Sequence, residues 1–383
     1  MLRTGVACRR GHDAARRMGL APPMCRWGCI AAVLLAVAAA PAEAATYSWT
    51  NTVSPSDWSL PANWSGGTSV PTSSDTAYIV NGGTASISSA GATCFYLSLG
   101  GTQGTGTVQM TGGSLAGNGG GEYVGDYGGT GTFNQSGGTN SAGSLLLEES
   151  GATYRLSGSG VLSGTGESVG HDGNALFQQT GGQNISTVVT IGSGGRYQMS
   201  GGTLQLNGGL QNLGVLDFSN SASVVNLSAN NILDFSSGTI VNAGSMSFNV
   251  GSNSLVLVPS GVNLASVFGS YSNAGMTHVP GTTLVVPAGQ GFGGSGTISD
   301  PVNCQGTITG APNSGINLKN GLVLSGNGSV AVGSTGWIDV NDSVSGMGGG
   351  TLSGGAVRDQ LFRDGSVHTI RRSKHDLRNH AGG

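Results

Sequence analysis

The stretch Phe133-Asn-Gln-Ser-Gly-Gly138 decides the fold, because four close variants of it recur along the chain. The variants are Val108-Gln-Met-Thr-Gly-Gly113, Tyr154-Arg-Leu-Ser-Gly-Ser159, Phe177-Gln-Gln-Thr-Gly-Gly182 and Tyr197-Gln-Met-Ser-Gly-Gly202. Their first residues are 25, 21, 23 and 20 positions apart. A repeat of that length is too short to bury a core alone, so each copy must stack on the next.

Within each copy, two larger residues alternate with a polar one, which is the period of a β-strand, and the glycines that follow favour a turn. A repeat of about 22 residues has room for roughly three short strands, and therefore for one coil of a solenoid. The sequence predicts an all-β chain forming an elongated right-handed β-solenoid, or parallel β-helix, with coils of about 20–25 residues. A sandwich of hairpins also tolerates glycine-rich turns, but it predicts no in-phase repeat.

The register of the repeat predicts which side chains face inward. One inward column contains Val108, Phe133, Tyr154, Phe177 and Tyr197. A second column beside it contains Met110, Gln135, Leu156, Gln179 and Met199. Equivalent residues of adjacent coils are expected about 4.8 Å apart.

Composition agrees with an ordered but polar chain. The 72 glycines among 383 residues follow no three-residue period, which excludes collagen, and interleaved aliphatic residues exclude a purely disordered chain. Residues 45–355 carry three basic and thirteen acidic side chains, a net charge of −10. Such a body offers no basic patch, so we expect no nucleic-acid partner and no polybasic attachment to lipid.

The first 44 residues have the pattern of a secretory signal peptide. Six arginines precede the apolar run Ile30–Ala40, and Ala42-Glu-Ala44 is a cleavage pattern of small residues. The apolar run is too short to span a bilayer permanently, so we expect no integral membrane segment in the mature chain. Cys94 and Cys304 remain after cleavage, and their separation along a solenoid predicts two small buried thiols and no disulfide.

The segment that precedes the repeats differs in kind from them. It contains Trp58-Ser-Leu-Pro-Ala-Asn63-Trp64, then Pro71 and Asp75-Thr-Ala-Tyr-Ile79. Together with repeats such as Val124-Gly125-Asp126 running to Phe133, and Val169-Gly170-His171 running to Phe177, it resembles exported bacterial surface proteins with autotransporter-type β-strand repeats. Many proteins of that group end in a PEP-CTERM sorting signal, and the tail of this chain departs from that pattern.

This resemblance implies an exported, non-catalytic structural or adhesive protein, secreted by a bacterium or held at its surface. Its implied partners are extracellular polysaccharides or other cell-surface components. We expect five segments: a signal peptide (1–44), a Trp-rich cap with the first strands (45–100), regular coils (101–220), irregular coils (221–355) and a charged, disordered tail (356–383).

One group of residues is a candidate for chemistry. Aligning the coils places Asp126, Glu149 and His171 at one position of three successive turns, with Glu148 and Asp172 as neighbours. Such a ladder suits Ca²⁺ as a cofactor, or acid–base work. The favoured interpretation is an exposed turn whose charges aid solubility.

The alternative function is a carbohydrate-binding or carbohydrate-active solenoid similar to a polysaccharide lyase. Trp58 and Trp64 would suit it as platforms for a sugar ring, although aromatic residues near a terminus more often cap a solenoid. A lyase also needs basic side chains to neutralise a sugar acid, and the body offers only Arg155, Arg196 and Lys319. We therefore expect no enzyme.

Overall fold

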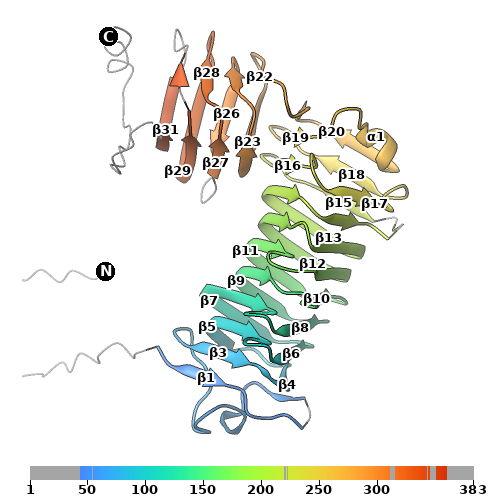
Figure 1. Cartoon of the computed structure of the whole chain (residues 1–383), viewed down its shortest axis with the longest axis vertical. Coiled ribbons are helices and arrows are strands. Elements are labelled where there is room, and N and C mark those ends of the chain that lie inside the picture. Colours follow the sequence, from blue (N-terminus) through green and yellow to red (C-terminus); the bar gives the residue numbers. More distant parts are fainter. Residues whose placement is uncertain are drawn as a thin grey trace, which may run out of the picture. The chain divides into compact units, whose positions relative to one another are not determined.

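The chain folds into a β-solenoid of about 12 turns in which nearly all regular structure is β-strand (Figure 1). The structure is a computed structural model that describes residues 44–53, 55–219, 221, 223–310, 315–342, 344–345 and 351–359. Every pairing between its named strands is parallel. The predicted solenoid is therefore confirmed, and a hairpin sandwich is excluded because its sequential strands would pair antiparallel.

The regular coils use the strands up to residue 217. These are β1 (Thr46–Ser48), β2 (Ser56–Asp57), β3 (Thr76–Ile79), β4 (Asn81–Ile87), β5 (Ala92–Leu99), β6 (Thr105–Met110), β7 (Ser114–Val124), β8 (Thr130–Gln135), β9 (Thr139–Leu147), β10 (Thr153–Leu156), β11 (Val161–Val169), β12 (Ala175–Ile191), β13 (Gly195–Asn212) and β14 (Val215–Asp217). A short 3-10 helix covers Pro61–Asn63.

Shorter strands and one helical turn form the next coils. They are β15 (Val224–Asn226), β16 (Ile232–Asp234), β17 (Thr239–Val241), β18 (Ser247–Val250), β19 (Leu255–Leu257), α1 (Leu264–Val267), β20 (Ser270–Asn273), β21 (Met276–His278) and β22 (Leu284–Val286).

The final strands follow residue 290. They are β23 (Gly291–Gly294), β24 (Gly296–Ile298), β25 (Val302–Cys304), β26 (Thr307–Gly310), β27 (Gly315–Leu318), β28 (Leu322–Leu324), β29 (Ser329–Val340), β30 (Val344–Ser345) and β31 (Thr351–Asp359).

The inward aromatic column is present in the predicted register. Pairing of β6, β8, β10, β12 and β13 aligns Val108, Phe133, Tyr154, Phe177 and Tyr197, and all five side chains are fully buried. The centroids of neighbouring rings lie 4.7, 5.2 and 4.6 Å apart, with nearly parallel planes. The second predicted column is buried beside it. Coil-to-coil stacking therefore hides the large side chains that a single repeat would expose.

Glycines permit the close approach of neighbouring coils at their turns. Gly125 and Gly170 follow β7 and β11 with a φ of 75°, in the left-handed region that side chains rarely adopt. A Cβ at Gly129 would lie 1.0 Å from the carbonyl oxygen of Gly100, in the preceding coil. No side chain fits at Gly129, so glycine is required there for its small size and not only for its backbone flexibility.

The tryptophans of the first segment pack against one another. Trp64 meets Trp49 and Trp58 edge to face, with ring centroids 5.0 and 4.8 Å apart, and its Nε1 donates a hydrogen bond to the carbonyl oxygen of Trp58. In the described residues β1 pairs only with β3, so this segment forms the first edge of the solenoid. Its position agrees with the predicted cap.

The later coils have a core of their own. Side chains of β22 to β29 form a second buried cluster, which also includes Ile232, Leu255 and Leu257 from β16 and β19. The backbone joins it to the earlier coils where Ser295 N donates to Gly208 O at 2.9 Å. Cys94 and Cys304 are free and fully buried, as predicted.

Two predicted segments fall largely outside the described residues. The signal peptide does so except for Ala44. The predicted disordered tail begins too early, because β31 runs to Asp359 and aligns Ala356–Asp359 with Trp337–Val340 of β29. Residues 360–383 of that tail lie outside the described part of the chain.

Candidate functional site

The predicted ladder of Asp126, Glu149 and His171 follows the ends of β7, β9 and β11. Asp126 is 2% exposed and accepts a hydrogen bond of 2.7 Å from the Tyr96 hydroxyl. Glu149 Oε1 accepts one of 3.2 Å from the backbone N–H of Gly128. Both carboxylates thus have partners that hold turns in place, and neither joins His171 in a set of three ligands.

His171 gathers instead with two residues that flank the predicted ligands. One potential ligand atom from each of Glu148, His171 and Asp172 lies within 4.8 Å of the others. The His171 ring is exposed, and its Nδ1 is 3.1 Å from Asp172 Oδ1. Burial raises the pKa of Glu148, as do the charges of Asp126 and Asp172, while His171 acts to lower it. This set suits a divalent cation, and its exposure equally suits a solvated turn.

The predicted sugar platforms are enclosed. Trp58 and Trp64 are 2% and 1% exposed, and each ring packs edge to face within the cap. A sugar stacks on an open aromatic face, and neither ring offers one in this arrangement. The geometry gives both residues a capping role.

The buried core contains hydrogen-bonded groups that the repeat did not predict. Two copies of one set occur, each made of a glutamate, an asparagine, a tyrosine and a glutamine. The first copy is Glu122, Asn140, Tyr154 and Gln135, and the second is Glu167, Asn184, Tyr197 and Gln179.

The contacts of the first copy link three successive coils. Asn140 Nδ2 donates to Glu122 Oε2 at 2.8 Å and to the Tyr154 hydroxyl oxygen at 3.2 Å. The Tyr154 hydroxyl donates to Gln135 Oε1 at 2.6 Å. The second copy repeats these contacts two coils later, with lengths of 2.9, 3.1 and 2.9 Å. Polar and apolar residues therefore alternate from coil to coil in the same columns.

The carboxyl groups of the two glutamates in these sets have raised pKa values. Burial raises the pKa of Glu122 to about 7 against the opposing hydrogen bond from Asn140. Burial likewise raises the pKa of Glu167 to about 7, against Asn184 and Ser186. Each carboxyl has one oxygen, Oε1, without a hydrogen-bond partner in the described structure. A proton on that oxygen would remove the cost of a buried charge.

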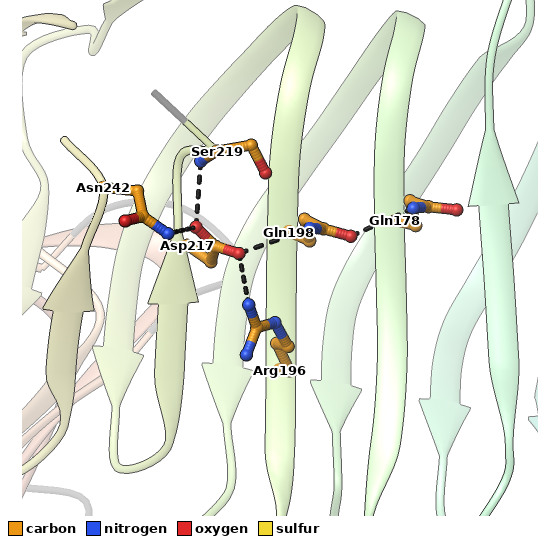
Figure 2. Close-up of polar contacts among 6 residues, drawn as sticks. All are labelled: Gln178, Arg196, Gln198, Asp217, Ser219 and Asn242. Carbon is orange, nitrogen blue, oxygen red and sulfur yellow. Dashed lines mark hydrogen bonds and ion pairs between the residues drawn. The ribbon is translucent and has the colours of Figure 1, made fainter. Parts of the chain in front are cut away.

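A polar column runs along the other side of the same strands, and its members are exposed or half-buried except for Asp217, which is buried. The residues that follow the aromatic column in register are Gln109, Asn134, Arg155, Gln178, Gln198 and Asp217. We call this column the outer ladder. Figure 2 shows its last coils, where Gln178 Nε2 donates to Gln198 Oε1 at 3.0 Å and Gln198 Nε2 donates to Asp217 Oδ2 at 3.3 Å.

Asp217 anchors that end of the outer ladder. Its Oδ1 accepts from the backbone N–H of Ser219 at 2.9 Å and from Asn242 Nδ2 at 2.8 Å, while Oδ2 pairs with Arg196 (Figure 2). Burial acts to raise the pKa of Asp217, but the bonds from Asn242, Ser219 and Arg196 outweigh it and hold that pKa below its ordinary value. The carboxylate therefore stays charged at neutral pH.

A shallow groove crosses the middle of the outer ladder. It has a volume of about 280 Å³ and is lined by Gln109, Asn134, Gln135, Ser136, Arg155, Ser157, Gln178 and Thr180. Arg155 is exposed and donates a long hydrogen bond of 3.4 Å to Asn134 Oδ1. It has no carboxylate partner among the described residues. Amides, hydroxyls and one guanidinium can hydrogen-bond a hydroxyl-rich or carboxylated ligand.

A histidine and aspartate pair lies at the end of β21, where His278 is the last residue of the strand. His278 Nε2 is 2.9 Å from Asp300 Oδ2, and Asp300 Oδ1 accepts from the backbone N–H of Gly281. Their side chains are 6% and 15% exposed. The pair fastens the loop after β21 to the segment after β24.

Comparison with protein-family models, with curated proteins and with solved structures gave no match. Within the described residues, no helix is long and apolar enough to cross a membrane.

Proposed function

We propose that the protein is an exported, non-catalytic structural or adhesive component that acts outside the bacterial cell. The observation that carries the proposal is the outer ladder, a column of amide and charged side chains repeated on coils that a stacked core holds in register. A rigid, repetitive polar face suits contact with an extended partner, because the same chemistry recurs about every 4.8 Å.

The roles of the carboxylates support a structural protein. Asp126, Asp217 and Asp300 each accept hydrogen bonds that hold a turn or a neighbouring coil. Glu122 and Glu167 lie inside the core, with exposed fractions of 0% and 3%. Catalysis at a sugar needs carboxylates or cations that face the substrate, and these five carboxylates serve the fold.

A second candidate is carbohydrate binding, and the groove at Arg155 favours it. We infer that a polysaccharide carrying carboxylates would lie along the outer ladder, with Arg155 meeting a carboxylate and the amides meeting hydroxyls. The lining of the groove contains no acidic side chain, so the guanidinium acts locally even though residues 45–355 are acidic overall. Screening beyond about 10 Å limits the repulsion from distant charges.

Affinity electrophoresis of the mature chain in pectin, alginate or neutral dextran tests carbohydrate binding. Carbohydrate binding predicts retardation in the carboxylated polymers that Arg155→Ala weakens and Lys319→Ala leaves unchanged. Lys319 is an exposed cation far along the chain, so it controls for the loss of one positive charge. Equal effects of the two substitutions, or no retardation, would show that the groove is not a polysaccharide site.

Activity assays with the same polymers and with chitin test the non-catalytic proposal. The expected result is no release of unsaturated or reducing ends. Turnover that is lost in a His171→Ala variant would contradict it and would make the Glu148, His171 and Asp172 cluster a catalytic site.

A further inference from the structure

The backbone of Ala45 lies against the side chain of Asp75. Ala45 N is 2.7 Å from Asp75 Oδ1, and Ala45 O accepts a hydrogen bond of 2.9 Å from the N–H of Thr76. Ala44 and Ala45 are exposed, whereas Asp75 is only 5% exposed. The nitrogen of Ala45 is therefore fixed to a nearly buried carboxylate at the point where the chain enters the solenoid.

Asp75 has no cation beside it in the described structure. Its Oδ2 accepts hydrogen bonds from the backbone N–H and the hydroxyl of Thr72, at 2.8 and 2.6 Å. Burial acts to raise its pKa, but the bonds from Thr72 and Ala45 outweigh burial and hold the pKa below its ordinary value. The fold thus keeps an anion nearly out of water, and a buried anion without a counter-charge is costly.

Cleavage of a signal peptide would place a positive charge on the nitrogen of Ala45, beside the Asp75 carboxylate. Ala42 and Ala44 have the small side chains that a signal peptidase accepts before its cleaved bond, so cleavage there would start the chain at Ala45. The cleavage pattern is independent of the fold, and the contact between Ala45 N and Asp75 is independent of the leader. Both features nevertheless select the same residue.

We propose that the Ala44–Ala45 peptide bond is cleaved during export and that the new α-ammonium group of Ala45 forms an ion pair with the Asp75 carboxylate. In the cleavage, water adds its hydroxyl to the Ala44 carbonyl carbon and a proton to the Ala45 nitrogen, which takes up a second proton at neutral pH. The neutral amide donor at 2.7 Å becomes a charged one, so a hydrogen bond from a neutral group to the carboxylate becomes an ion pair between opposite charges. Asp75 is thus the receiving site for the processed N-terminus.

Mass spectrometry of material exported by a bacterium tests the cleavage. The expected mature chain begins at Ala45. A chain that begins at any other residue, or that keeps its leader, would overturn the proposal.

Thermal unfolding of chains that begin at Ala45 or at Ala44 tests the ion pair. Retaining Ala44 keeps the N–H donor of Ala45 but moves the ammonium group one residue away. We expect the chain that begins at Ala45 to melt higher by on the order of 2 °C at pH 6. In the Asp75→Asn background the two chains should melt together. Equal melting with Asp75 intact, or an unchanged difference in the Asp75→Asn background, would contradict the pair.

The pH dependence distinguishes the ion pair from a packing effect of Ala44, because a packing effect would not change with pH. An α-amino group has an ordinary pKa of about 8, and an adjacent carboxylate raises it in the folded state. The stabilisation is therefore complete below about pH 8 and is lost as the pH rises through the folded value. The difference in melting temperature between the two chains should vanish by about pH 11. A difference that persists there would refute an ionic origin.

Discussion

The ring of Tyr154 stacks on that of Phe177 with centroids 5.2 Å apart and planes 2° from parallel, although the two residues are 23 positions apart in the sequence. Tyr154 and Phe177 contact each other through one face of each ring. The opposite face of Tyr154 stacks on Phe133, and the opposite face of Phe177 stacks on Tyr197. The stability of any one coil therefore depends on its neighbours, as it does in other repeat proteins.

Close approach of the coils predicts a sharp difference between two glycines. Gly129→Ala should strongly destabilise the chain, because its Cβ would lie 1.0 Å from Gly100 O, and this backbone oxygen cannot move alone. Gly166→Ala should change the free energy of unfolding by less than about 0.5 kcal/mol, because a Cβ there meets nothing within 4 Å. Urea denaturation of both variants measures the difference. Similar losses would show that the turns are not packed against each other as described.

Neutral acids in the core predict that the chain is less stable above neutral pH. The folded pKa of Glu122 and of Glu167 is about 7, above the ordinary value of 4.5, so the folded state holds protons that the unfolded state releases. Stability should therefore be greatest below about pH 4.5 as far as these two groups are concerned, and should fall as the pH rises to about 7. Linkage puts the loss at about 3 kcal/mol for each glutamate at most.

Denaturation between about pH 5 and pH 8 measures this loss. Glu122→Gln keeps the size of the side chain and an acceptor for Asn140 but cannot ionise, so it should remove about half of the decline. Asp172→Asn, at an exposed carboxylate, should leave the decline unchanged. Stability that is flat or rising over this range in the unmodified chain would show that the two glutamates are not buried acids.

The sequence was sufficient to predict the solenoid and its inward columns, because aromatic residues and Gly-Gly turns recur at one-coil spacing. It did not reveal the contact of Glu122 with Asn140, since the polar sets recur every second coil and draw their members from three coils. Gln135 and Gln179, two polar residues in a column of Met and Leu, were the available signal. A buried amide needs partners, and the search for them leads to Tyr154 and Tyr197.

The candidate sites were less predictable for a related reason. Coil alignment placed Asp126, Glu149 and His171 at one position, but side-chain direction is set by local turns, and Asp126 points to Tyr96. The pair of Arg196 and Asp217 lies where the repeated phrase ends, so no spacing indicated it. The contact of Ala45 with Asp75 joins residues whose sequence patterns suggested unrelated roles.

Comparison of Phe177→Asp with Gln178→Asp tests the stacked inward column most directly. Phe177 is fully buried between two rings, while Gln178 is the next residue and belongs to the outer ladder. We predict that Phe177→Asp lowers the free energy of unfolding by several kcal/mol, because it places a charge in the core, and that Gln178→Asp lowers it by under about 0.5 kcal/mol. Equal unfolding of the two variants would contradict the register and, with it, the solenoid.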